Sequence, residues 1–83
     1  MELKDTVEMM VSDDYRERFK AEYYQTKIRF DKLVNMLEHW NSGELNFKPT
    51  CSKWVFECQA RAMEEYLEQL KERAEIEKIE IKA

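Results

Sequence analysis

The sequence is poor in the residues that build loops and metal sites. It contains one glycine, one proline, one histidine and two cysteines among 83 residues. A single histidine, with no CxxC or HxxxH spacing, argues against a zinc site, and we expect no metal. Along a helix Cys51 and Cys58 would stand about 10 Å apart, which is too far for a disulfide. They are expected to be free thiols.

Patterns of catalysis and of membrane insertion are also missing. There is no glycine-rich phosphate loop, no Ser-His-Asp order and no paired carboxylates in a setting that would raise their pKa. We therefore expect a protein that is not an enzyme and needs no cofactor. The sequence has no run of 18 apolar residues, and its N-terminus lacks the basic-then-apolar order of a signal peptide. A cytoplasmic protein without a membrane span is expected.

The charge argues against one class of partner. The net charge is −4, whereas a binder of a DNA or RNA duplex is expected to carry a basic excess. The segment from residue 15 to residue 32, however, contains six basic residues and only three acidic ones. A small anionic ligand on this segment is one interpretation, and solvated helix faces with i,i+4 ion pairs are the other.

What the sequence does contain is helical periodicity. From Tyr15 to Trp40 a stripe recurs at intervals of three or four residues, over about 39 Å if helical. Its members are Tyr15, Phe19, Tyr23, Thr26, Phe30, Leu33, Leu37 and Trp40. A second periodic stretch runs from Ser52 to Ile76, so the two predict a long antiparallel helical hairpin.

Local signals divide the chain into one all-α domain, residues 1–83. Asp5 and Glu8 have capping-box spacing in a short leading helix, and Asp14 and Glu17 repeat this spacing before the long helix. Gly43 is expected as the left-handed residue that ends the long helix. The predicted segments are a leading helix or arm (1–12), a first helix (13–41), a connection (42–51), a second helix (52–76) and a tail (77–83). The tail is expected to be a helix end or an extended arm that docks on a neighbour.

A two-helix hairpin covers one side of each helix and leaves two flanks open. Four Phe, four Tyr, two Trp and five Met have to be accommodated in this small chain. Self-association buries apolar flanks without additional sequence. We therefore expect a homo-oligomer.

The predicted interface between the helices contains polar residues. On the second helix it consists of Val55, Gln59, Met63, Tyr66, Leu70 and Arg73, and Glu22 of the first helix falls near the level of residues 70–73. A Glu22–Arg73 ion pair that fixes the register is one hypothesis, because an unpaired buried charge is costly. The other is that Arg73 and first-helix cations such as Arg18, Lys27 and Arg29 line a pocket in which Arg73 donates two hydrogen bonds to a phosphate.

The tyrosines also leave two interpretations open. Tyr15, Tyr23, Tyr24 and Tyr66 stand at helical spacing, which is typical of core or interface residues. An aromatic side chain beside a cation is also what a nucleobase with its phosphate needs, and Thr26 and Lys27 follow Tyr23 and Tyr24 within one turn.

These residues resemble a known family. The pattern Arg18, Glu22, Arg29, Phe30, Leu33 on the first helix, followed by Gln59, Met63, Tyr66, Leu70, Arg73 on the second, is similar to a family of small proteins of crAss-like phages. That family shares a hairpin with the phage sponges that defeat CBASS and Thoeris immunity. The similarity covers about residues 15–74, and the short segment before Ser12 resembles the first helix of the anti-CBASS sponges.

The resemblance implies a phage anti-defence protein of the infected bacterial cytoplasm. It would form a homo-oligomer such as a hexamer and sequester cyclic di- or trinucleotides or cyclic ADP-ribose isomers without cleaving them. The matching positions are Arg18, Glu22, Arg29, Tyr66 and Arg73; chemistry and proximity add Tyr15, Tyr24, Thr26 and Lys27 to the candidate site. The alternative function is a helical adaptor whose apolar flanks dock on another protein.

Overall fold

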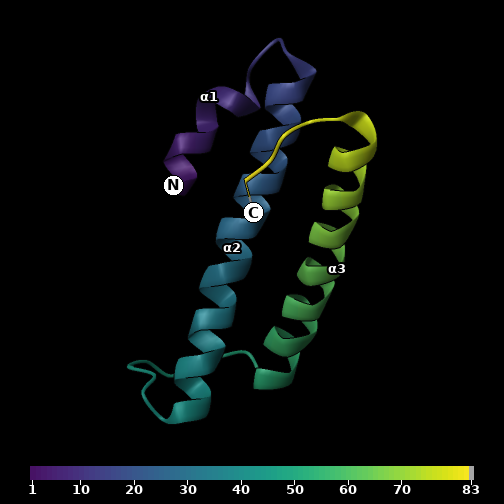
Figure 1. Ribbon diagram of the computed structural model, residues 1–83. Coiled ribbons are helices and arrows are strands. Elements are labelled where there is room, and N and C mark those ends of the chain that lie inside the picture. The colour runs from purple at the N-terminus through teal and green to yellow at the C-terminus, as the bar shows by residue number, and fades with distance from the viewer. Residues whose placement is uncertain (83) are drawn as a thin grey trace.

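The computed structural model describes residues 1–82, all of whose regular elements are helical. A 3₁₀ helix η1 (Leu3–Thr6) continues into α1 (Val7–Met10), and two long helices follow, α2 (Tyr15–Ser42) and α3 (Lys53–Glu77). Figure 1 shows α2 and α3 side by side and antiparallel, with η1 and α1 beside the first part of α2. The prediction of an all-α fold is confirmed for the described residues.

Both ends of α2 are defined by single residues. The Asp14 side chain accepts a hydrogen bond from the backbone N–H of Arg16 at 2.9 Å, which caps the first turn. At the other end Gly43 has φ 79, in the left-handed region, and the next N–H, of Glu44, bonds back to the carbonyl of His39 at 2.8 Å. This is a Schellman ending, for which glycine is the preferred residue because it lacks a Cβ.

The same ending recurs on α3 with a different residue. Ser52 caps its start, and at its end Lys78 takes the left-handed conformation with φ 57 while Ile79 N–H bonds to Ala74 O at 2.9 Å. The chain is thereby turned back toward the hairpin. A lysine in this conformation pays a steric cost that glycine avoids.

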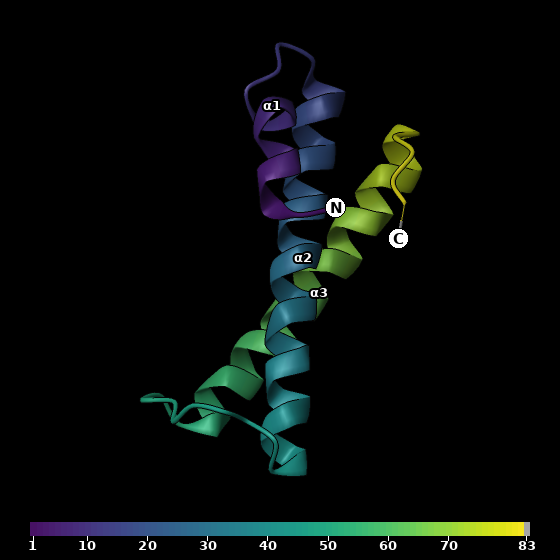
Figure 2. The ribbon, with the colours of Figure 1, turned by 90° about the vertical axis from the view of Figure 1, so that its left-hand side faces the viewer.

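The main core lies near the open end of the hairpin, away from the connection. It is built from Phe19, Tyr23, Leu67, Leu70, Ala74 and Ile79. Toward the connection the buried apolar residue is Leu37, and Trp40 and Phe56 meet edge to face with their ring centroids 6.1 Å apart. Figure 2 shows that the two helices cross rather than run parallel.

The predicted face of α3 was right in part. Met63 and Leu70 turn toward α2 as expected, but Val55 and Tyr66 are 51% and 42% exposed, and Arg73 is exposed as well. The residues that turn toward α2 form the inner stripe, in which the other four members each follow a predicted residue by one position: Phe56, Ala60, Met63, Leu67, Leu70 and Ala74. The displacement follows from burial, because this stripe supplies Leu67 and Ala74 where the predicted one supplies Tyr66 and Arg73.

The leading segment packs on the back of α2, on the side away from α3. Ala21 and Thr6 are both fully buried, and the small Ala21 side chain allows the two segments to approach closely. The Thr6 hydroxyl donates to the Leu3 carbonyl at 2.7 Å. Arg18 is committed to this arrangement too, since its Nη1 donates to the carbonyl of Ser12 at 2.7 Å.

The tail returns to its own hairpin rather than reaching for a neighbour. Ile79 is buried and Ile81 packs against the core, while the N–H of Lys82 donates to the Tyr24 hydroxyl at 3.1 Å. Arg16 reinforces the turn by donating from Nη2 to the carbonyls of Glu77 and Lys78, each at 3.4 Å. The expectation of an arm that docks on a neighbour is therefore replaced by an intramolecular contact.

The molecule is extended for its size. Its radius of gyration is 14.9 Å, against about 12 Å for a compact chain of this length. Its accessible surface is 6167 Å², against about 5,300 Å² for a typical monomer of this mass. An isolated copy thus leaves an unusual amount of surface uncovered.

Candidate functional site

Apart from Arg18, the predicted site residues fall on two opposite flanks of the hairpin. At about 100° per residue, Tyr15, Glu22 and Arg29 lie on one side of α2, and Tyr24 and Lys27 lie on the other. The first side, together with the α3 residues that contact it, is called the arginine flank: Tyr15, Glu22, Thr26, Arg29, Tyr66, Arg73 and Glu77. The second is called the lysine flank: Met1, Tyr24, Lys27, Ile28, Asp31 and Lys82. The structure does not bring the nine predicted residues together in one copy.

Arg73 is the centre of the arginine flank. Its Nη2 donates to the Tyr15 hydroxyl at 2.9 Å, and its Nε lies 3.4 Å from Glu77 Oε2. Tyr15 donates in turn to the other oxygen of Glu77 at 2.8 Å, and the Arg73 guanidinium carbon stands 4.9 Å from the centroid of the Phe19 ring. These contacts hold the guanidinium in one orientation on an exposed surface. The Tyr15 hydrogen bond, followed by Glu77, raises the pKa of Arg73 above its ordinary value.

Glu22 has a different partner from the one that the sequence suggested. The Tyr66 hydroxyl donates to Glu22 Oε2, while Arg73 bonds to Tyr15 and Glu77. The hypothesis of a Glu22–Arg73 register pair was therefore wrong. Tyr66 rather than Arg73 lies at the level of Glu22, and Arg73 lies beside Tyr15, so the register between the helices differs from the expected one by about one turn.

The remaining residues predicted for this flank contribute unequally. Arg29 is exposed on it, one turn beyond Thr26. The Thr26 hydroxyl donates to the carbonyl of Glu22 on its own helix at 2.8 Å. Arg18 belongs to the leading segment through its bond to Ser12. The arginine flank therefore offers two cations, Arg29 from α2 and Arg73 from α3.

The lysine flank contains a cavity of about 500 Å³. Met1, Tyr24, Lys27, Ile28, Asp31 and Lys82 line it. Lys27 Nζ lies 2.8 Å from Asp31 Oδ1 and 5.7 Å from the centroid of the Phe30 ring. The hydrogen bond to Asp31 raises the pKa of Lys27, so this cation is charged at neutral pH. Lys27, Lys82 and the Tyr24 ring thus surround this cavity.

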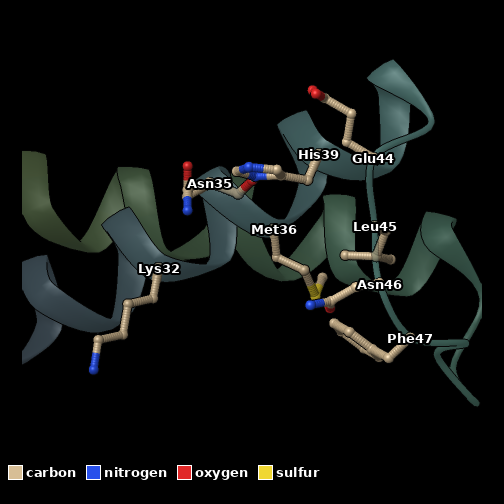
Figure 3. Close-up of a pocket in the computed structure, with 8 residues that line it drawn as sticks. All are labelled: Lys32, Asn35, Met36, His39, Glu44, Leu45, Asn46 and Phe47. Carbon is tan, nitrogen blue, oxygen red and sulfur yellow. The ribbon is translucent and has the colours of Figure 1, made fainter.

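A further hollow of about 270 Å³ lies at the turn of the hairpin and contains none of the predicted site residues (Figure 3). Met36 points toward Leu45, Asn46 and Phe47 of the connection, and His39 lies above them. One ring nitrogen of His39 is 2.8 Å from the carbonyl oxygen of Asn35. The connection folds against α2 here, although Phe47 stays 54% exposed.

Within residues 1–82 a cluster of metal ligands and a membrane-spanning helix are both missing. No group of three or more His, Cys, Asp or Glu side chains is placed there to hold a metal ion. None of the helices in that range combines the length and the apolar character that a bilayer crossing requires. Cys51 and Cys58 are free thiols.

The chain is a helical hairpin with charged and aromatic groups on its open flanks, and comparison with known families shows which family it belongs to. Residues 13–76, more than half of the chain, match the family described as Sequestin, and the chain belongs to that family. The match covers α2, the connection and nearly all of α3. No curated protein and no solved structure gives a significant match. The name of the family indicates sequestration.

Proposed function

We propose that this protein sequesters a phosphate-bearing signalling nucleotide, a cyclic oligonucleotide or a cyclic ADP-ribose isomer, as a phage anti-defence protein in the cytoplasm of the infected bacterium. The observation that carries the proposal is the Arg73 guanidinium, held between Tyr15, Glu77 and the Phe19 ring on an open flank. Membership of the Sequestin family supports retention of a ligand over its conversion.

The geometry of Arg73 suits an anion. A guanidinium carries five N–H donors in a fixed fork, and the two contacts to Tyr15 and Glu77 engage its Nε and Nη2 edge. Donors on the other edge are available to a phosphate. The contacts that position Arg73 also reduce the side-chain entropy lost on binding.

Bases can be held by the rings beside it. Tyr15 and Tyr66 are each more than 40% exposed on the same flank as Arg73. Stacking of a base on an aromatic face is worth about 1–3 kcal/mol, and it tolerates different bases. On a single copy the flank is an open surface, so enclosure of a ligand requires a second copy, in keeping with the homo-oligomer that we propose.

The test compares two α3 cations with the same substitution. Binding is measured by thermal shift and calorimetry against cyclic di- and trinucleotides and cyclic ADP-ribose isomers. A ligand at 100 times its Kd should stabilise the native protein by about 2.7 kcal/mol. Arg73→Ala should weaken binding at least tenfold, and Lys71→Ala, which removes an exposed cation paired with Glu68, should not.

Two results would contradict this function. One is the absence of a shift with every nucleotide tested, and the other is equal binding by the two variants. Sequestration itself is checked by denaturing the loaded protein and identifying the released nucleotide by chromatography. An intact nucleotide supports retention, and a cleaved one would point to an enzyme.

A second function, that of a protein-binding adaptor, is favoured by one observation. Trp54 near the start of α3 is 63% exposed, and Arg61 lies over its ring at 5.7 Å. Tryptophan and arginine are enriched among the residues that dominate protein interfaces. An adaptor should lose its protein partner in a pull-down when Trp54 is changed to Ala and keep it when Arg73 is changed to Ala. A nucleotide sponge should show the reverse dependence in the calorimetric assay.

A further inference from the structure

α3 carries a second stripe beside the one that packs on α2. It begins one residue earlier, and we call it the outer stripe: Val55, Gln59, Ala62, Tyr66, Gln69, Arg73 and Ile76. All seven residues are exposed. Val55, Tyr66 and Ile76 expose 51%, 42% and 71% of their surface. Large apolar groups at both ends of the stripe are therefore in contact with water.

The spacing of the outer stripe is that of a helix-to-helix contact. Its members alternate at four and three residues, an average of 3.5, which is the heptad repeat of helices that pack along their length. The inner stripe has the same repeat, and α2 occupies it. Tyr66 and Arg73 reach Glu22 and Tyr15 of α2 with their polar ends. In residues 1–82 no helix packs along the outer stripe itself, and all of its members stay exposed. The repeat thus predicts a second helical partner for α3.

The composition of the outer stripe selects the direction of that partner. The stripe is symmetric about Tyr66, with Val55 and Ile76 at its ends. An antiparallel copy of α3 places Val55 against Ile76, Ala62 against Gln69, and Gln59 against Arg73. A parallel copy places Arg73 against Arg73, and two like charges in contact repel each other. Antiparallel helices also align their dipoles favourably.

We propose that two copies of this chain pair through the outer stripes of antiparallel α3 helices, with the two-fold axis at Tyr66. The pairing brings Gln59 of the second copy beside Arg73, so that each arginine flank is completed by an amide from its partner. Tyr66 then packs against its counterpart, and Tyr15 is the ring of the flank that is left open to a base. The importance of this contact for binding rests on the proposed function, but the pairing itself does not.

The area available agrees with a dimer. The surface of 6167 Å² exceeds that of a typical monomer of this mass by about 850 Å². Each partner in a stable interface of standard size buries about 800 Å². A helix face of seven heptad positions with apolar ends supplies a contact of this kind.

Cysteine crosslinking tests the direction of pairing without any ligand. In a background with Cys51→Ser and Cys58→Ala, Val55→Cys and Ile76→Cys are made separately, and one of the two carries a mass tag. The two proteins are mixed and oxidised. The antiparallel pairing predicts a mixed disulfide as the dominant product, because residues 55 and 76 of opposite copies lie together. Two copies of residue 55 would then lie about 32 Å apart, beyond the reach of a disulfide.

The outcomes are distinct. Dominant crosslinking of Val55→Cys to itself would show a parallel pairing and overturn the proposal, as would the absence of any crosslink.

A second measurement does not need cysteines. Ala62→Arg introduces a charge one turn from Tyr66 at the centre of the outer stripe, and light scattering should show at least a tenfold weaker dimer. The matched variant Glu64→Arg, on another face of α3, should leave the dimer intact. A mass of one chain for the unmodified protein at micromolar concentration would overturn the pairing and the proposed homo-oligomer, whereas nucleotide binding by the protein is decided separately by the calorimetric assay.

Discussion

The open end of the hairpin and its turn are packed differently. At the open end α2, α3 and the returning tail together enclose Phe19, Tyr23, Leu67, Leu70, Ala74 and Ile79. At the turn Leu37 is buried, and the rings of Trp40 and Phe56 meet edge to face. The same two helices take part at both ends, so the difference comes from the third element. Two crossing helices bury little, and the tail is what encloses the core.

The proposed binding groups lie at the better-packed end of the hairpin. Arg73, Tyr15 and Glu77 contact one another there, and the guanidinium of Arg73 lies over the Phe19 ring. Groups held on a rigid surface lose less entropy on binding than groups on a mobile one. The hollow at the turn, with Phe47 exposed, lacks such support.

The largest expected effect compares the same change at the two ends. Leu70 is 1% exposed and Leu37 is 9% exposed. Leu70→Ala should destabilise the fold by about 2–5 kcal/mol, because it leaves a cavity in an enclosed core. Leu37→Ala should cost clearly less, because solvent and neighbouring side chains can fill the gap. Urea denaturation of both variants checks the order, and equal losses would contradict the comparison.

The contribution of the tail is tested at Ile79. Ile79→Ala should lower the free energy of unfolding by about 2 kcal/mol, since its side chain closes the core although it lies outside the helices. Val11→Ala is the matched control, because Val11 is 77% exposed and should change stability by less than about 0.5 kcal/mol. If both changes were equally mild, the tail would not be part of the core.

The smallest effect has the opposite sign. Tyr23 is fully buried, and among the described residues its hydroxyl has no hydrogen-bond partner. Leaving a polar group buried in this way costs about 1–3 kcal/mol. Tyr23→Phe removes only the hydroxyl and should raise the stability by about 1 kcal/mol, measured as an increased Tm. A loss of stability would show that the hydroxyl is satisfied in solution.

The boundaries of the long helix followed from local chemistry. Asp14 as a cap and Gly43 as a left-handed residue are short-range signals, and the structure shows both. The face of α3 could not be found in this way, because two heptad stripes lie one residue apart and share their periodicity. Which stripe packs against α2 depends on the burial of Leu67 and Ala74, and this requires the partner helix to be placed.

The grouping of the site residues could be predicted only in part, because it also depends on the placement of the helices. Tyr23 and Tyr24 are neighbours in sequence, yet one is buried in the core and the other lies on the lysine flank. Proximity in sequence grouped Tyr24 and Lys27 with Tyr15, but a helix separates neighbouring residues by about 100° around its axis. The partner of Arg73 depended on the register between the two helices, which no short-range signal encodes.

The left-handed backbone conformation of Lys78 at the end of α3 affects how readily the tail opens. A non-glycine residue in this conformation costs about 1–2 kcal/mol relative to the right-handed region. That cost is released when Lys78 relaxes and the tail lifts away, so this segment should detach at a lower free energy than the helices unfold. In native-state hydrogen exchange, the amides of Ile79 and Lys82, which bond to Ala74 and Tyr24, should therefore exchange through local opening, before those at the centre of α3.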